Sequence, residues 1–118
     1  MTKNQFLLYP PGSEDCLYLN IFTKHPGDTE ANRPVLVWFH GGAFIFGGAE
    51  LYRPGFIMEE DVVLVVVQYR LNIFGFMTLE DEAMAGNYGM FDQVQALRYG
   101  NSPFLIFWIF FSPIHAFV

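Results

Sequence analysis

Cysteine is almost absent from this chain, which has Cys16 alone among its 118 residues. A lone cysteine excludes a disulfide framework within the chain and cannot build a metal site by itself. We therefore interpret Cys16 as a small apolar residue. Basic residues are scarce as well, because six lysines and arginines stand against twelve acidic residues and give a formal net charge of −6. An acidic chain is a poor match for nucleic acid or for an anionic membrane surface.

Long apolar runs are also missing, although 53% of the residues are hydrophobic and 19% are aromatic. A membrane-spanning helix needs about 20 apolar residues, whereas residues 104–111 form an apolar run of only eight. We therefore expect no membrane span. Near the start of the chain only residues 6–8 form an apolar run before two prolines. That run is too short for the core of a signal peptide, so we expect no export signal and leave localisation open.

Charge disappears from the last part of the chain. All eighteen formal charges lie between Lys3 and Arg98, and five of the fourteen phenylalanines lie after residue 100. This change in composition predicts two parts, a single domain over residues 1–99 and an apolar tail over residues 100–118. The tail has the β-prone composition of an aggregation-prone segment.

Three strands are predicted within residues 1–99. Residues 17–23 alternate between two sets of side chains, which is typical of a strand at a sheet edge or in a hairpin. Residues 35–39 and 62–69 are apolar and rich in β-branched residues, which predicts strands buried on both faces of a parallel sheet.

A helix is predicted after the third strand. Asn87 is expected to cap a helix over residues 89–99, and Met90, Val94 and Leu97 fall on one face of it. Buried strands followed by a helix indicate an α/β sheet.

A glycine turn follows the second predicted strand. The strand ends in His40, and Gly41 and Gly42 then permit backbone conformations that a Cβ atom forbids. A strand that opens into such a turn can point consecutive backbone N–H groups at one position. That geometry stabilises the oxyanion of an acyl-transfer reaction, so we predict an oxyanion hole here.

Four segments together resemble the type-B carboxylesterase/cholinesterase family. The glycine turn is similar to the His-Gly-Gly-Gly type loop of α/β-hydrolases. The other segments are residues 13–21 (Ser-Glu-Asp-Cys-Leu-Tyr-Leu-Asn-Ile), 68–76 (Gln-Tyr-Arg-Leu-Asn-Ile-Phe-Gly-Phe) and 85–93 (Ala-Gly-Asn-Tyr-Gly-Met-Phe-Asp-Gln). They occur in the order of the family with similar gaps. The combination of His-Gly-Gly-Ala-Phe with Tyr-Arg-Leu-Asn resembles insect carboxylesterases most.

The resemblance implies part of an α/β-hydrolase fold, namely the N-terminal-side strands, the oxyanion-hole loop and one helix of a central, mostly parallel sheet. It also implies hydrolysis of a small carboxylic ester by a serine, a histidine and an acidic residue through an acyl-enzyme. No cofactor, metal ion or nucleic acid is expected, and the oligomeric state stays open.

The resemblance also assigns residues to the oxyanion hole. Gly42 and Ala43 match its backbone donors, and Gly41 supports them. Ala43 stands where the family more often has glycine. Its N–H still donates, although its Cβ narrows the allowed φ and ψ.

Structural roles are expected for three further residues. His40 precedes the turn and suits holding the loop better than acting as a base. In the family, the counterparts of Arg70 and Asp92 pair, so we expect an ion pair that ties the end of the third strand to the helix.

The nucleophile of the family has no counterpart in this sequence. The family serine lies in Gly-x-Ser-x-Gly after the next strand, whereas Ser102 is followed by Pro103 and has Phe104 in place of the second glycine. His25 has no carboxylate partner in view. We therefore expect a fragment that is inactive alone. The alternative is a fragment of a non-catalytic, cholinesterase-like adhesion or binding protein.

The tail departs from the family near the position where the nucleophile strand is expected. Gly100 and Asn101 can be encoded by GGT-AAT, which contains the start of a splice-donor sequence. We therefore hypothesise that residues 100–118 derive from a retained intron or a gene-model artefact. A well-supported transcript with residues 95–118 inside one exon would contradict this. A short isoform that binds or interferes with a partner is a further alternative, which needs a detectable transcript and a stable product.

Overall fold

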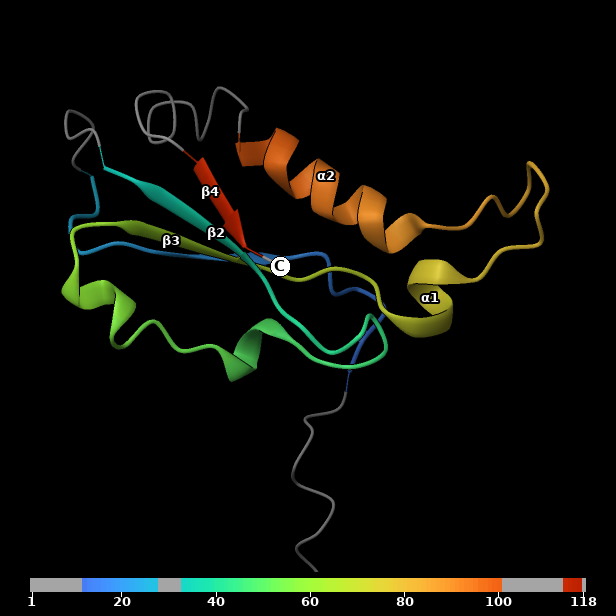
Figure 1. The fold of residues 1–118 in the computed structure, drawn as a ribbon, viewed down its shortest axis with the longest axis horizontal. Coiled ribbons are helices and arrows are strands. Elements are labelled where there is room, and N and C mark those ends of the chain that lie inside the picture. The colour runs from blue at the N-terminus through green and yellow to red at the C-terminus, as the bar shows by residue number, and fades with distance from the viewer. Residues whose placement is uncertain (1–11, 28–32, 101–113, 118) are drawn as a thin grey trace, which may run out of the picture.

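The computed structural model describes residues 12–27, 33–100 and 114–117. Their strands form one sheet in the order β1-β3-β2-β4 (Figure 1). The strands are β1 (Leu19–Phe22), β2 (Val35–Phe39), β3 (Val63–Val67) and β4 (Ile114–Phe117). β2 runs parallel to both β3 and β4, whereas β1 is antiparallel to β3. The helical elements are two 3₁₀ turns, η1 (Ala49–Leu51) and η2 (Ile57–Glu59), and the helices α1 (Asn72–Phe76) and α2 (Tyr88–Gly100).

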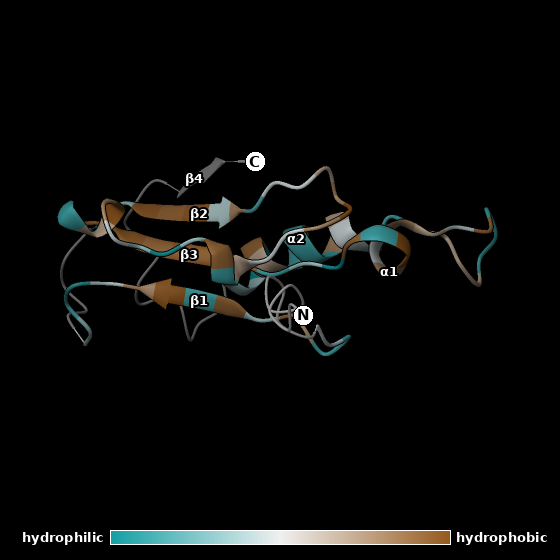
Figure 2. Cartoon of the chain, turned by 90° about the horizontal axis from the view of Figure 1, so that it is seen from below, coloured by the Kyte–Doolittle hydropathy of each residue, from teal (hydrophilic) through white to brown (hydrophobic). Residues whose placement is uncertain are grey.

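The parallel pair β2–β3 forms the apolar centre of the sheet, as the hydropathy colouring in Figure 2 shows. Every residue of β3 is at most 7% exposed. Valine dominates both strands because its branched side chain packs well on a pleated surface. The predictions of buried, parallel strands at residues 35–39 and 62–69 are confirmed, although β3 is shorter than predicted. The strand predicted at residues 17–23 is present as β1 at the sheet edge.

Different elements cover the two faces of this central pair (Figure 1). On one face, Ala96 and Leu97 of α2 pack against a cluster of buried β2 and β3 side chains. On the other face, Tyr52 and Met58 pack against Leu64 and its buried neighbours in β3. The segment that contains η1 and η2 therefore covers this face, where a helix covers the other.

α2 turns a different face toward the sheet from the one predicted. Met90 is 39% exposed and Val94 is 42% exposed, so of the predicted apolar face only Leu97 packs against the core. Gly89 is buried instead, and a Cβ added there would lie 2.5 Å from the carbonyl oxygen of Arg70. This close backbone contact sets the rotation of the helix, which the spacing of apolar residues does not encode.

Two local features also differ from the predictions. Asn87 has a φ of 61°, and within the described residues its side chain makes no hydrogen bond, so the predicted side-chain cap is wrong. A capping side chain needs extended backbone at its own position; here only the Asn87 carbonyl accepts, from the N–H of Phe91 at 3.3 Å. Residues 72–76 form the short helix α1, whereas the sequence analysis predicted a helix only over residues 89–99.

The tail contributes one strand to the sheet. The backbone of β4 pairs with β2 from Val35 opposite Ile114 to Trp38 opposite Phe117. The sequence predicted β-prone composition in the tail but no defined strand. Ser102 lies outside the described residues, so its predicted lack of a catalytic role stays a prediction. Within the part of the chain that the structure describes, no helix is long and apolar enough to cross a membrane.

Candidate functional site

The glycine turn after β2 has an unusual backbone conformation. Gly42, Ala43 and Phe44 follow one another with φ values of 129°, 54° and 62°. The N–H groups of Ile45 and Phe46 both donate to the carbonyl of Gly42, at 3.0 and 3.2 Å. A Cβ added at Gly42 would collide with the carbonyl oxygen of Phe46, so only glycine fits at this position.

The turn leaves a run of consecutive backbone donors free. Within the described residues, none of the four N–H groups from Gly41 to Phe44 donates a hydrogen bond. Gly42 and Ala43 are the two of these that the resemblance assigns to an oxyanion hole. Gly42 is half-buried and Ala43 is exposed, so both groups are within reach of a bound molecule. Successive N–H groups in a turn of this kind form a concave site for an anion or for a developing negative charge.

His40 forms the buried base of the turn. Its side chain is 1% exposed, and its ring stacks on the ring of Tyr69 with centroids 4.6 Å apart. Nδ1 lies 3.0 Å from the carbonyl oxygen of Gly41. Because a carbonyl only accepts, this contact requires a proton on Nδ1. Nε2 has no hydrogen-bond partner within the described residues.

Gly47 closes the turn and was missed as a site residue by the sequence analysis. Its φ is 127°, and a Cβ there would lie 2.6 Å from the carbonyl oxygen of Gly41 and 2.7 Å from Nδ1 of His40. The side chain of His40 therefore packs directly against a backbone that must be glycine. The Gly47-Gly48 pair in the sequence was the available signal, since paired glycines mark positions of this kind.

Tyr69 joins the end of β3 to the base of the turn. It is 4% exposed, and its hydroxyl donates to the backbone carbonyl of His40 at 2.5 Å. Its ring also meets the ring of Phe44, with centroids 6.3 Å apart. Burial raises the pKa of the Tyr69 hydroxyl, and the nearby Tyr52 adds to this effect. The group therefore stays protonated as a donor over the neutral range.

The predicted ion pair between Arg70 and Asp92 is confirmed. Nε and Nη2 of Arg70 donate to the two carboxylate oxygens at 2.8 and 2.7 Å, and the backbone N–H of Arg70 adds a third bond at 3.1 Å. The Asp92 side chain is only 7% exposed, whereas that of Arg70 is 35% exposed. The hydrogen bond to Asp92 raises the pKa of Arg70 above its already high ordinary value.

The backbone around this ion pair is packed closely. A Cβ at Gly75 or Gly89 would approach the carbonyl oxygen of Arg70, so α1 and α2 both reach that carbonyl through a glycine. The guanidinium also lies 5.3 Å from the ring centroid of Tyr88. The segment after β3 is therefore fixed to α2 by charge, hydrogen bonds and close backbone packing.

A catalytic triad is not assembled within the described ranges. Ser13 is the single serine there, and it is exposed, with its hydroxyl accepting the N–H of Asp15. His25 does have a carboxylate nearby, contrary to the sequence interpretation, because Asp61 lies 3.7 Å from its Nε2. Both side chains are more than half exposed and lie at the opposite end of the sheet from the turn. Among the described residues no group of three or more His, Cys, Asp and Glu side chains could hold a metal ion.

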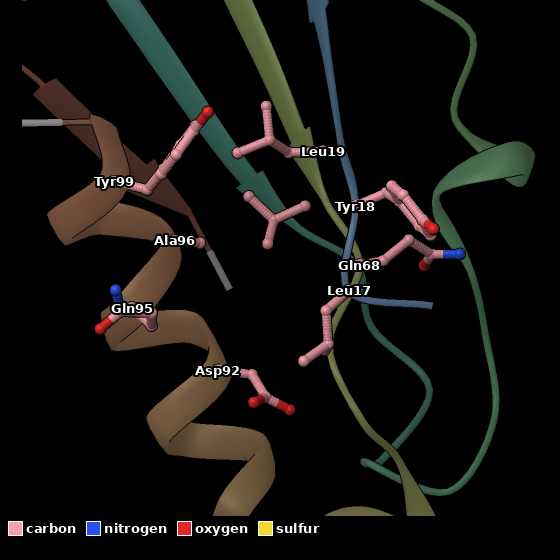
Figure 3. A pocket seen from close by; sticks show the side chains of 9 residues that line it. Leu17, Tyr18, Leu19, Gln68, Asp92, Gln95, Ala96 and Tyr99 are labelled. Carbon is pink, nitrogen blue, oxygen red and sulfur yellow. The ribbon is translucent and has the colours of Figure 1, made fainter. Parts of the chain in front are cut away.

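A cavity of about 390 Å³ opens between α2 and the edge of the sheet (Figure 3). Leu17, Asp92 and Tyr99 are among the residues that line it. None of the turn residues contributes to its lining. The cavity is therefore separate from the free N–H groups, and the candidate site is the turn.

The model of the carboxylesterase family matches residues 1–101. Among similar curated proteins, "Cocaine esterase" from Homo sapiens is 49% identical over 88 residues, which cover 74% of this chain and 16% of the relative. "Carboxylesterase 1E" from Mus musculus is 53% identical over 91 residues, with coverage of 74% and 16%. The chain thus spans about a sixth of the length of these curated relatives.

Solved structures give the same result. The juvenile hormone esterase from Manduca sexta matches with a TM-score of 0.69 and 34% identity, over 83% of this chain and 19% of the matched chain. The carboxylesterase EST55 from Geobacillus stearothermophilus matches with a TM-score of 0.75 and 41% identity, over 93% and 25%. These neighbours are esterases of α/β-hydrolase fold. The chain therefore belongs to the carboxylesterase family and carries part of its α/β-hydrolase fold.

Proposed function

We propose that this chain carries the oxyanion-stabilising part of a carboxylic ester hydrolase. The observation that supports the proposal is the run of free N–H groups from Gly41 to Phe44, held close after a buried strand. Within this run, Gly42 and Ala43 are the donors that the resemblance assigns. The names of the relatives, among them esterases and carboxylesterases, support an ester as the substrate class. Gly41 supports the donors by shaping the approach to them, and His40 holds the loop from beneath.

In this mechanism a serine attacks the ester carbonyl and the carbonyl oxygen becomes an oxyanion. The N–H groups of Gly42 and Ala43 donate to that oxygen, and a third N–H comes from the residue after the serine. Preorganised donors of this kind act where charge develops, which lowers the barrier without reorganisation. The burial of His40, which is 1% exposed, supports a structural role for this residue in place of a catalytic one.

The chain alone is expected to be inactive. Within the described residues the donors lack a serine, a histidine base and an orienting carboxylate beside them. An oxyanion hole without a nucleophile stabilises an intermediate that does not form.

A hybrid esterase tests the proposal. Residues 13–99 replace the matching segment of EST55, which supplies the remaining strands and the nucleophile. We expect the hybrid to hydrolyse p-nitrophenyl acetate well above a hybrid whose nucleophilic serine is replaced by alanine. The 118-residue chain alone should show no turnover above buffer. A folded hybrid without turnover would contradict the proposal and favour a non-catalytic relative.

A further inference from the structure

We infer that Tyr69 is the positioning residue of the oxyanion site. It holds the Gly42 and Ala43 donors in place through contacts at both ends of the turn. This inference rests on the proposed function. Tyr69 touches no part of a substrate in this arrangement. It acts through the backbone of the turn.

The contacts of Tyr69 fall on the residues that flank the donors. Its hydroxyl donates to the carbonyl of His40, just before the turn, and its ring stacks on the His40 ring at an angle of 23°. The same ring meets Phe44, the residue just after Ala43. One side chain therefore contacts the turn on both sides of Gly42 and Ala43.

A second link joins the same two segments. The N–H of Asn72 donates to the carbonyl of Phe44 at 2.7 Å. Between Tyr69 and Asn72 lies Arg70, which is fixed to α2 through Asp92. The turn is therefore attached at two points to a segment that the helix holds still.

The hydroxyl of Tyr69 controls the orientation of the first peptide of the turn. Within the described residues no other donor reaches the carbonyl of His40. Without that donor, the peptide between His40 and Gly41 is free to rotate, and rotation there redirects the N–H groups that follow. Oxyanion donors work only within a narrow distance range of the reacting oxygen, and a displacement of about 1 Å costs much of the rate.

The test compares Tyr69→Phe with Tyr99→Phe in the hybrid esterase. Tyr99 is 53% exposed on α2 and lies outside the turn, so it serves as the matched control. We expect Tyr69→Phe to lower kcat roughly three- to tenfold, the range that one buried hydrogen bond provides, with KM nearly unchanged. The affinity for a trifluoromethyl ketone, which mimics the oxyanion, should fall in parallel with kcat/KM. Tyr99→Phe should change none of these values.

Restoring a hydrogen-bond donor at residue 69 distinguishes a positioning role of Tyr69 from a general loss of stability. Replacing Tyr69 by 4-aminophenylalanine restores a donor at the same place on the same ring, and we expect it to recover most of kcat. Recovery of folding without recovery of kcat would overturn the inference. So would a Tyr69→Phe hybrid with unchanged kcat and ketone affinity while Gly42→Ala abolishes turnover. If Gly42→Ala is also without effect, the proposed oxyanion site itself fails.

Discussion

The two ends of the β2–β3 pair carry similar chemistry in different surroundings. At the amino end, Nε of Arg33 lies 2.7 Å from the carboxylate of Asp61, whose side chain is 61% exposed. At the carboxyl end, Arg70 lies 2.7 Å from the carboxylate of Asp92, whose side chain is 7% exposed. The distances are the same, but different partners are buried. The amino end buries its arginine, whose side chain is 10% exposed, whereas the carboxyl end buries its carboxylate, which also accepts from Nε and the backbone N–H of Arg70.

This difference indicates that the backbone is held more firmly at the carboxyl end of the β2–β3 pair. At the amino end, the contact from Lys24 to the carbonyl of Glu59 is exposed, and the carboxylate that pairs with Arg33 is open to solvent. The carboxyl end places stacked aromatic rings and glycine contacts beneath the turn that holds the free N–H groups. In open α/β sheets ligands bind beyond the carboxyl ends of the strands, so the carboxyl end is also the end where the proposed ester would bind.

The largest expected effect comes from Gly42→Ala in the hybrid esterase. The new Cβ would collide with the carbonyl of Phe46 and would also disfavour the φ of 129°. The turn must therefore change shape, and loss of its donors should lower kcat on the order of 10²–10³-fold. Gly55→Ala is the control, since a Cβ there meets nothing within 4 Å. Equal activity of both variants would remove the distinction between the rigid turn and an ordinary loop.

The coupling energies of the two ion pairs allow a direct comparison of the two ends. Double-mutant cycles on Arg70–Asp92 and on Arg33–Asp61, measured by urea unfolding of the chain, give the two coupling energies. We expect about 1.5–3 kcal/mol for Arg70–Asp92, because a buried carboxylate bonded to a charged donor gains more than an exposed one. We expect a smaller coupling for Arg33–Asp61, because its carboxylate is 61% exposed and solvent screens the pair, although the Arg33 side chain is only 10% exposed. Equal couplings would show that burial does not distinguish the ends.

Alkaline pH weakens the rigid end through Tyr69. Its folded-state pKa is raised by burial above the unfolded value of about 10. The stability that the buried hydroxyl contributes is therefore complete below about pH 10 and is lost as the pH rises toward the folded pKa. The difference in unfolding free energy between the native chain and Tyr69→Phe should shrink above about pH 10. A difference that stays constant from about pH 8 to 11 would contradict this.

The smallest effect is expected for Ala43→Gly. Ala43 has a φ of 54°, a conformation that costs an L-residue roughly 1 kcal/mol and glycine almost nothing. Because glycine loses more chain entropy, we expect a net gain of about 0.5 kcal/mol in unfolding free energy. Esterase activity of the hybrid should be retained, since the N–H remains. Ala49→Gly is the control and should destabilise, because Ala49 is 3% exposed and packed in the core.

Much of this end of the sheet could be predicted from the sequence. Runs of β-branched residues located β2 and β3, and their lack of polar positions indicated burial on both faces. The glycines after His40 located the turn because few other residues allow its backbone. The Arg70–Asp92 pair came from the resemblance to a family, since two charges 22 residues apart give no local signal.

Other features could not be read from spacing. Met90 and Val94 satisfied the helical period as well as the buried positions do. Contacts with distant residues, among them the close approach of Gly89 to Arg70, decided which side of α2 meets the sheet. The role of Tyr69 needed three dimensions as well, because its partner His40 lies 29 residues earlier. Residues brought together by parallel strands leave no periodic trace in the chain.

The sequence alone determined the strands β1, β2 and β3, the position of the turn and the carboxylesterase family, because the allowed backbone conformations and the apolar character of a segment are local properties. The tertiary structure decided which donors in the turn stay free and which side chains lie beneath it. It also decided that β4 closes the edge of β2. Those outcomes depend on contacts between distant segments, and packing settles them only when the whole sheet is assembled.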